Sequence, residues 1–317
     1  MSALEQAWWT DRPAGWQRAL LAALWPAELA FAGAARLRGL AYDRRWLEVA
    51  TAPAPVISVG NVAVGGAGKT PVTHAIATRL AARGRRVAIL SRGYGAVRSD
   101  VRVVADGERV LLEAEAGGDE PVLLARRLPG VRALCGPRRA ELASLATGAL
   151  GADTLLLDDG FQHRALARDL DVVVLDAANP FGNGHLLPVG PNREPRRALG
   201  RAGLVWLSRA DQALPEQLER LRVLAFRATG RGPVESRHAP STCSTARSPV
   251  PAGWPPSAAS GCCCSPAWPG PAPSAAPSRG WAPRWWPSGV TPTTTASPPP
   301  ISTGRVPPPT PPGPSGS

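Results

Sequence analysis

The chain has 317 residues, with 36 Lys and Arg against 24 Asp and Glu, a formal net charge of +12 and a hydrophobic fraction of 44%. That length allows one large domain or two moderate ones, and no apolar run reaches the roughly 18 residues that a membrane-spanning helix needs. Glu5 and Asp11 stand where a signal peptide would be basic, and the five cysteines lack paired metal-ligand spacing, so we expect no signal peptide, disulfide framework or zinc site.

Residues 1–45 are apolar and rich in tryptophan. Trp16, Leu20 and Leu24 fall on one face of a helix that Pro26 interrupts. One interpretation is a pair of amphipathic helices in the membrane interface, with tryptophans such as Trp8 at headgroup depth. The other is amphipathic helices docked on the protein's own domain. The pattern leaves both open.

Residues 46–237 alternate short buried-strand patterns with helical patterns, which predicts an α/β domain with a mainly parallel sheet flanked by helices. The predicted strands are Val56–Val59, Val87–Leu90, Val131–Leu134, Thr154–Leu157, Val172–Leu175 and Leu204–Leu207. The predicted helices are Thr70–Arg83, Pro121–Leu128, Arg138–Leu150 and Pro215–Arg222. Val101–Leu112 has the pattern of a hairpin that turns at Asp106.

A glycine-rich loop follows the first predicted strand and leads into a helix, the context that a phosphate-binding loop requires. The residues expected to bind nucleotide are Ala63, Val64, Gly65, Gly66, Ala67, Gly68, Lys69 and Thr70. Lys69, the only lysine of the chain, would reach the terminal phosphates of ATP, and the Thr70 hydroxyl would bind Mg²⁺. The alternative is a glycine-rich turn without a nucleotide.

Two aspartates follow the buried strand Thr154–Leu157. Asp158 or Asp159 can hold Mg²⁺ at the carboxyl edge of the sheet, which is the position of a Walker-B carboxylate. The alternative is a pair of turn aspartates before Gly160. His163 stands four residues beyond Asp159 and is a further candidate site residue.

Gly118, Asp119, Glu120 and Pro121 open a predicted helix. Asp119 is a candidate base that accepts the proton of an attacking hydroxyl. From the residues alone, the favoured explanation is an N-cap aspartate with a first-turn glutamate, which stabilises a helix for ordinary reasons. Polar loops at 91–95 and 187–195 each carry an arginine able to grip a phosphate, with solvated surface arginines as the alternative.

These motifs together resemble the tetraacyldisaccharide 4′-kinases of lipid A synthesis. The matching stretches are SVGNVAVGGAGKTP (58–71), SRGYG (91–95), GDEP (118–121), DDGFQH (158–163), DVVVLDA (171–177), GNGHLLPVGPNREP (182–195) and SRAD (208–211). The resemblance implies an ATP- and Mg²⁺-dependent kinase for an acylated glucosamine disaccharide 1-phosphate, peripheral to the cytoplasmic face of the inner membrane. It also tips residues 1–45 towards binding the inner-membrane surface.

Site roles follow from the resemblance, position by position. Lys69 and Thr70 bind ATP and metal, Asp158 and Asp159 handle Mg²⁺, and Asp119 is the catalytic base. The substrate side is lined by Glu120, Gln162, His163, Arg193 and Glu194.

The composition changes near residue 238, where the resemblance stops. Residues 239–317 contain 22 Pro, 13 Ser, four Arg and no acidic residue, and such proline density blocks helices and central strands. We therefore predict a low-complexity, disordered tail at 238–317 in place of the family's second lobe. Reading Cys262–Cys264 and Thr291–Ser297 in a shifted frame gives family-like segments, so we expect a frameshift here, which leaves the kinase impaired.

Two other functions stay open at this point. A P-loop ATPase or GTPase switch that acts through partner binding would share the phosphate loop without needing Asp119 or Arg193. A basic protein that binds nucleic acid would fit the net charge of +12. Because the arginines are scattered and the tyrosines are few, we expect no nucleic-acid partner.

Overall fold

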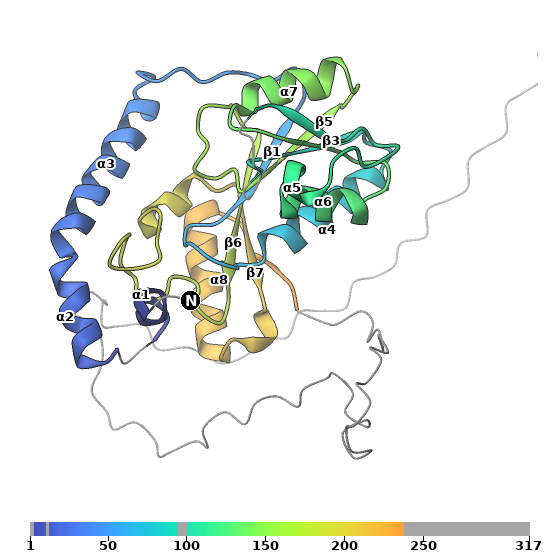
Figure 1. Cartoon of the computed structure of the whole chain (residues 1–317). Coiled ribbons are helices and arrows are strands. Elements are labelled where there is room, and N and C mark those ends of the chain that lie inside the picture. Colours follow the sequence, from blue (N-terminus) through green and yellow to red (C-terminus); the bar gives the residue numbers. More distant parts are fainter. Residues whose placement is uncertain (1–2, 11–12, 94–99, 238–317) are drawn as a thin grey trace, which may run out of the picture. The chain divides into compact units, whose positions relative to one another are not determined.

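The computed structural model describes residues 3–10, 13–93 and 100–237. Its strands are β1 (Val56–Gly60), β2 (Val87–Ser91), β3 (Arg102–Ala105), β4 (Arg132–Cys135), β5 (Thr154–Asp158), β6 (Leu170–Asp176), β7 (Leu204–Ser208) and β8 (Val234–Glu235). They form one sheet in the order β3-β4-β2-β5-β1-β6-β7-β8, in which β3 runs antiparallel to β4 and the other pairings are parallel (Figure 1). The predicted α/β class is confirmed.

Helices cover both faces of this sheet. They are α1 (Ala3–Trp8), α2 (Gly15–Ala23), α3 (Trp25–Asp43), α4 (Lys69–Ala81), α5 (Ala114–Gly117), α6 (Asp119–Arg127), α7 (Arg139–Gly148) and α8 (Pro215–Thr229). One face packs on α4 and α6 through residues such as Val72 and Leu124, and the other packs on α7 and α8 through Leu142 and Leu221. Alternate residues of the central strands therefore serve two separate cores.

The six predicted strands and four predicted helices are all present, with ends shifted by a few residues. The predicted hairpin is only partly formed: β3 is a strand, but its second arm makes a single bridge between Ala105 and Val110. β3 pairs with β4 in the sheet, and the second arm keeps two backbone hydrogen bonds, from the Leu111 N–H to the Val104 carbonyl at 2.8 Å and from the Asp106 N–H to the Arg109 carbonyl at 3.3 Å. Helix α8 continues seven residues beyond its predicted end, and the two-residue strand β8 was not predicted.

The N-terminal helices dock on the sheet domain through polar groups. The carboxylate of Glu28, which is 8% exposed, accepts a hydrogen bond of 2.7 Å from the Leu186 N–H and pairs with His185 Nδ1 at 3.1 Å. At the other end of α3, Arg164 donates to the Gly39 carbonyl at 3.0 Å and pairs with Asp43. The long helix is thus held at both ends by groups from loops near the carboxyl edge of the sheet.

The prediction that Trp8 lies at the headgroup depth of a membrane is wrong. Trp8 is 8% exposed and donates its indole N–H to the Pro188 carbonyl at 3.1 Å, because the loop after β6 wraps around α1. Trp16 and Trp25 are 59% and 56% exposed, as an interfacial helix requires. The docked interpretation therefore holds for Trp8, and the membrane-interface interpretation of the exposed helices stays a prediction.

The described residues lie within one compact unit, Met1–Ser241, and the second unit is Thr242–Ser317. The predicted tail at 238–317 and the Tyr94–Gly95 part of the polar loop at 91–95 lie outside the described residues. The predicted domain boundary near residue 237, the predicted disorder and the expected frameshift stay predictions.

Candidate nucleotide-binding site

The glycine-rich loop connects β1 to α4 at the carboxyl edge of the sheet. Gly68 adopts a left-handed conformation, with φ of 84°, directly before the first residue of α4. A side chain there would be strained and would lie 3.3 Å from the Ser208 Cβ, so this position requires glycine. The loop thereby brings the N-terminus of α4, with its unpaired N–H groups, to the edge where a phosphate can bind.

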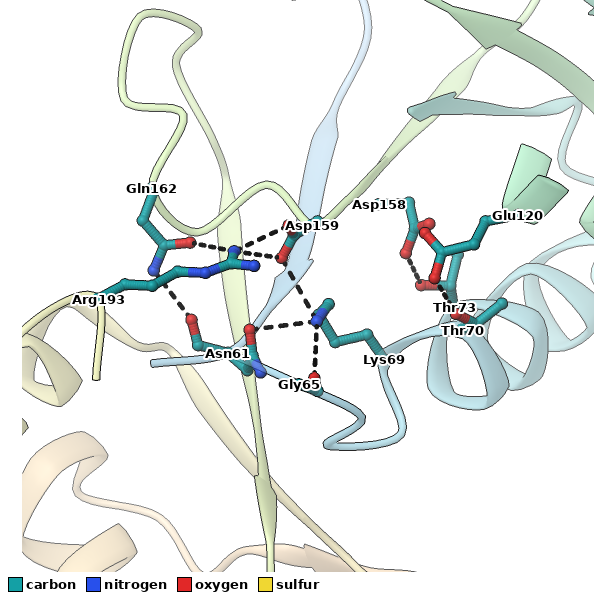
Figure 2. Close-up of polar contacts among 10 residues, drawn as sticks. All are labelled: Asn61, Gly65, Lys69, Thr70, Thr73, Glu120, Asp158, Asp159, Gln162 and Arg193. Atoms are coloured by element: carbon teal, nitrogen blue, oxygen red, sulfur yellow. Dashed lines mark hydrogen bonds and ion pairs between the residues drawn. The ribbon is translucent and has the colours of Figure 1, made fainter. Parts of the chain in front are cut away.

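Figure 2 shows a first polar network centred on Lys69. The Lys69 ammonium lies 3.3 Å from Asn61 Oδ1, 3.5 Å from the Gly65 carbonyl and 3.6 Å from Asp159 Oδ1. Arg193 donates to both carboxylate oxygens of Asp159, at 2.8 and 3.1 Å. One carboxylate thus holds two cations from different segments, and one of them, Lys69, contacts the loop at the Gly65 carbonyl.

Gln162 extends the same network. Its carboxamide nitrogen donates to the Asn61 carbonyl at 2.9 Å, and its oxygen lies 3.4 Å from Arg193 Nη1 (Figure 2). Asp159 itself has a φ of 52°, a left-handed conformation that turns the chain sharply at the end of β5. Gly160 follows, and a Cβ there would lie 2.6 Å from the Leu157 Cβ. The turn from β5 therefore needs the Asp-Gly pair for its shape as well as for its charge.

A second polar network joins α4, β5 and α6. Thr73 donates to Asp158 Oδ1 at 2.9 Å, and the Thr70 hydroxyl lies 3.4 Å from Glu120 Oε1 (Figure 2). All the side-chain groups in this network are oxygens. It lies directly beside the Lys69 network, since Asp158 and Asp159 are consecutive.

Burial and neighbouring charges separate the two aspartates. Burial raises the pKa of Asp158 to about 6, with Glu120 and Asp159 adding to the rise and the hydrogen bond from Thr73 opposing it. Burial also acts to raise the pKa of Asp159, but Lys69 and Arg193 hold it below the usual value. Two cations therefore stabilise the ionised form of Asp159, whereas the positive charge near Asp158 is too small to offset the burial of its carboxylate.

The remaining predicted site residues lie around these networks. Asp119 is exposed on the first turn of α6, directly before Glu120, and the N-cap of that helix is Gly118. The N-cap interpretation of Asp119 is therefore wrong, since its backbone is already helical. Burial and then the surrounding arginines, Arg139 first, lower the pKa of His163 to about 4, which makes His163 neutral at neutral pH.

A cavity of about 350 Å³ lies between α3 and the Lys69 network. It is lined by Phe31, Ala34, Ala35, Arg38, Gly39, Gln162, Arg164, Arg193 and Glu194. Glu194 is fixed there by Arg201, which donates to its two carboxylate oxygens at 2.7 and 3.0 Å. The cavity therefore has apolar side chains from the helix on one side and charged groups of the site on the other.

Several residues at the site were not predicted. Asn61 binds the Lys69 ammonium, and Thr73 binds Asp158 one helical turn beyond Thr70. Ser208 and Arg209, at the end of β7, hydrogen-bond to the Ala67 and Gly66 carbonyls of the loop. Asn61 and Thr73 flank the phosphate loop in the sequence and could have been found by their spacing. Ser208 and Arg209 lie in the SRAD stretch (208–211) that matches the family, but their contact with the loop could be found only through the fold.

The fold and this site define the class of protein as α/β, P-loop NTPase-like. A glycine loop joins β1 to α4, which begins with Lys69 and Thr70, and carboxylates lie at the end of the neighbouring strand β5. Within this class the family model LpxK, tetraacyldisaccharide-1-P 4′-kinase, matches residues 20–254. The chain belongs to this family.

Curated relatives agree with that assignment. The chain is 69% identical to the tetraacyldisaccharide 4′-kinase of Anaeromyxobacter sp. (strain K) over 241 residues, which are 76% of this chain and 64% of that protein. It is 50% identical to the enzyme of the same name from Pelobacter propionicus over 199 residues, 62% of this chain and 55% of that protein. The chain thus spans less than two thirds of the length of these relatives.

A solved structure shows the same fold. It is an "apo" form of LpxK from Aquifex aeolicus in complex with ATP, with 37% identity and a TM-score of 0.56 over 59% of this chain and 58% of that chain. This likeness agrees with the predicted family.

Proposed function

We propose that this protein is an ATP-dependent kinase that phosphorylates the 4′-hydroxyl of a tetraacylated glucosamine disaccharide 1-phosphate in lipid A biosynthesis. The observation that carries the proposal is the meeting of Lys69 from the phosphate loop with Asp159 and Arg193 from two other segments. Phosphoryl transfer depends on positioning and on cations around the transferred group, and this cluster supplies two cations fixed by one carboxylate. Membership of the family and the names of the curated relatives support the acceptor.

Mg²⁺ fits the second polar network. The ion prefers oxygen ligands and retains waters and phosphate oxygens, so it needs few protein ligands. Thr70 and Asp158 would hold it, with Glu120 and Asp159 alongside. The raised pKa of Asp158 supports this, because a divalent cation would supply the positive charge that this buried carboxylate lacks. When bound, the ion would neutralise charge on the phosphates. Among the described residues, no group of three or more His, Cys, Asp or Glu side chains is placed to hold a metal ion, so the phosphates and water would supply the other ligands of Mg²⁺.

Asp119 is the proposed base. It stands beside Glu120, whose carboxylate lies 3.4 Å from the Thr70 hydroxyl, so the first turn of α6 borders the phosphate loop. As an exposed carboxylate on that turn, Asp119 would accept the proton of the acceptor hydroxyl. Gln162, Arg193 and Glu194 would bind the polar part of the acceptor from the opposite side.

The cavity beside α3 suits an amphiphilic acceptor. Phe31, Ala34 and Ala35 present apolar surface for acyl chains, and Arg193 and Glu194 present charge for the sugar phosphate. His163, which does not line this cavity, is neutral at neutral pH and would act on the acceptor by hydrogen bonding and not as a cation.

Helices α2 and α3 would hold the protein on the cytoplasmic face of the inner membrane. Leu29 and Leu37 of α3 are 59% and 67% exposed, as Trp16 of α2 and Trp25 of α3 also are, at 59% and 56%. Interfacial helices bury such side chains at headgroup depth while arginines contact anionic lipid. In the described part of the chain no single helix is long and apolar enough to cross a membrane, and the bent pair α2 and α3, with an angle of 47°, passes that test by length and composition alone.

The proposal is tested by transfer of labelled phosphate from ATP to a tetraacyldisaccharide 1-phosphate. Lys69→Ala is expected to lower transfer at least about a hundredfold, since a cation facing the transferred group is lost. Arg85→Ala, which removes an arginine paired with Asp153 at the opposite, amino-terminal edge of the sheet, is the matched control and should leave transfer unchanged.

The same assay on the product of a frame-corrected gene measures how much transfer activity is lost when residues 238–317 stand in place of the family's second lobe. We expect higher transfer from the corrected protein, and the Lys69→Ala change should abolish that transfer too. If both proteins hydrolyse ATP at a rate that does not depend on the acceptor, and transfer no phosphate to it, the result would favour a P-loop ATPase or GTPase switch and contradict the kinase.

A further inference from the structure

The loop 182–192 lies between helix α3 and the phosphate loop. On the helix side, the Leu186 N–H donates to the Glu28 carboxylate at 2.7 Å. On the other side, a backbone bridge pairs Asn192 with Ala63, the first residue of the expected nucleotide-binding stretch. One short segment thus contacts both regions, and the phosphoryl transfer described above gives Glu28 no part.

Two backbone hydrogen bonds flank the bridge to the phosphate loop. The Val64 N–H donates to the Pro191 carbonyl at 2.7 Å, and the Arg193 N–H donates to the Val62 carbonyl at 2.8 Å. The side chain of Arg193 then reaches the Asp159 carboxylate, at 2.8 Å. The end of the loop therefore fixes both the backbone where the phosphate loop begins and the place from which Arg193 enters the site.

Hydrogen bonds within the loop connect its two sides. Leu186, which Glu28 holds, forms a bridge with Asn192, and the buried Asn192 carboxamide donates to the His185 carbonyl at 2.7 Å. Gly190 has no space for a Cβ, because the Asn183 side chain and the His185 backbone lie against it. A loop cross-linked in this way moves as a unit, so a displacement of its Leu186 side is passed on to Asn192.

The contact made by Glu28 is specific in direction. Glu28 is the only buried residue of α3, and one of its oxygens accepts the Leu186 N–H while His185 Nδ1 lies 3.1 Å from the other. A buried carboxylate costs free energy unless its oxygens are hydrogen-bonded, and a hydrogen bond to a charged acceptor is short and strong. An apolar side chain could have packed the helix on the domain, whereas this carboxylate fixes the position of one loop amide.

We propose that Glu28 is a positioning residue for the nucleotide site, acting through Leu186 and Asn192 on the backbone of the phosphate loop. This inference rests on the proposed nucleotide site and adds a connection to it from α3. Amides at a helix start bind phosphate best when their backbone is already ordered, so loss of the connection weakens nucleotide binding. Because α3 also carries the exposed Leu29 and Leu37, the same path connects the proposed membrane contact to the ATP site.

Hydrogen exchange resolved by residue and isothermal titration with Mg²⁺-ATP, both on the full 317-residue chain, test this role. Glu28→Ala should speed exchange of the Leu186 and Val64 amides at least about tenfold, the scale of one lost hydrogen bond to a charged group. It should also weaken ATP binding about threefold to thirtyfold, the usual range for coupling through a contact network. Glu28→Gln keeps an oxygen acceptor for the Leu186 N–H and should restore both readouts to within about twofold of the parent protein.

Asp43→Ala is the matched control on the same helix. It removes the carboxylate that pairs with Arg164 at the other end of α3, so it loosens the helix without touching the path through Leu186. Exchange at Val64 and binding of ATP should therefore stay unchanged. Thermal unfolding of each variant verifies that the domain is folded.

Three results would overturn the positioning role. Glu28→Ala could speed exchange at Leu186 but leave exchange at Val64 or ATP binding unchanged, which would mean that Glu28 only holds the helix. Glu28→Gln could fail to restore the readouts, or Asp43→Ala could reproduce the effects of Glu28→Ala. Lys69→Ala should weaken ATP binding without altering exchange at Leu186; if ATP binding does not change, the proposed nucleotide site itself fails, a result distinct from any seen with Glu28.

Discussion

The sheet core and the helices α2 and α3 distribute their side chains in opposite ways. In β5, Leu155, Leu156 and Leu157 are completely buried. In α3 the only buried residue is Glu28, while Leu29 beside it is 59% exposed. A folded protein normally buries its apolar residues and leaves carboxylates in water.

The inversion indicates what each region packs against. The sheet finds its apolar partners within the chain, whereas α3 faces its own domain with a carboxylate and turns its leucines outward. Several large apolar side chains exposed on one pair of helices are typical of a site of interaction. The cavity beside Phe31 and Arg193 lies where the two regions meet, which suits an acceptor with both polar and acyl parts.

The largest expected effect is the loss of a core leucine. Leu156→Ala should lower the free energy of unfolding by about 2–5 kcal/mol, because a completely buried side chain leaves a cavity. Leu37→Ala, at 67% exposure on α3, should change it by less than about 0.5 kcal/mol. Urea denaturation measures both. Similar decreases in the free energy of unfolding for the two variants would show that α3 packs like the core and would contradict the contrast between the two regions.

Asp158 gives a smaller effect of opposite sign. The folded pKa of Asp158, about 6, lies above the usual value of 3.8, so its contribution to stability is complete below pH 3.8 and is lost as the pH rises through about 6. Asp158→Asn should therefore raise the free energy of unfolding at pH 7.5, by at most about 3 kcal/mol, and little at pH 4. Unfolding in EDTA at both pH values tests this. A variant less stable than the parent at pH 7.5 would refute the assigned charge balance.

Replacing Glu28 should lower the stability with which α3 is held on the domain by about 1–3 kcal/mol. Glu28→Ala leaves the Leu186 N–H without its side-chain acceptor at a nearly buried site. His185→Ala keeps that hydrogen bond and removes only the exposed partner, so it should cost less. Hydrogen exchange of α3 measures both variants, with faster exchange expected for Glu28→Ala. Equal effects would show that the ion pair, and not the backbone hydrogen bond, holds the helix.

The smallest effect on stability should accompany a large effect on lipid binding. Trp25→Ser, at a side chain that is 56% exposed, should change the free energy of unfolding by less than about 0.5 kcal/mol. Sedimentation with anionic vesicles should nevertheless show severalfold weaker binding, because an interfacial tryptophan is lost. Trp8→Ser should instead destabilise the protein, since Trp8 is buried on its own domain. Unchanged vesicle binding by Trp25→Ser would contradict the interfacial role of α2 and α3.

The sequence by itself determined the class of fold and the centre of the site. Strand and helix patterns are local, and the phosphate loop and the aspartates at the end of β5 have requirements that neighbouring residues satisfy. Gly68 needs its left-handed backbone and Asp159 its turn, whatever the rest of the chain does. These positions could therefore be predicted, and so could the family that combines them.

Only the tertiary structure decided how distant segments meet. Arg209 reaches Gly66 across 143 positions of sequence, and the SRAD stretch that contains Arg209 gives no sign of this partner. Trp8 and Trp16 look alike in the sequence, but one is buried by the loop after β6 and the other faces outward. The physical reason is that burial and long-range hydrogen bonds depend on which segments the sheet order brings together, and that order is a property of the whole domain.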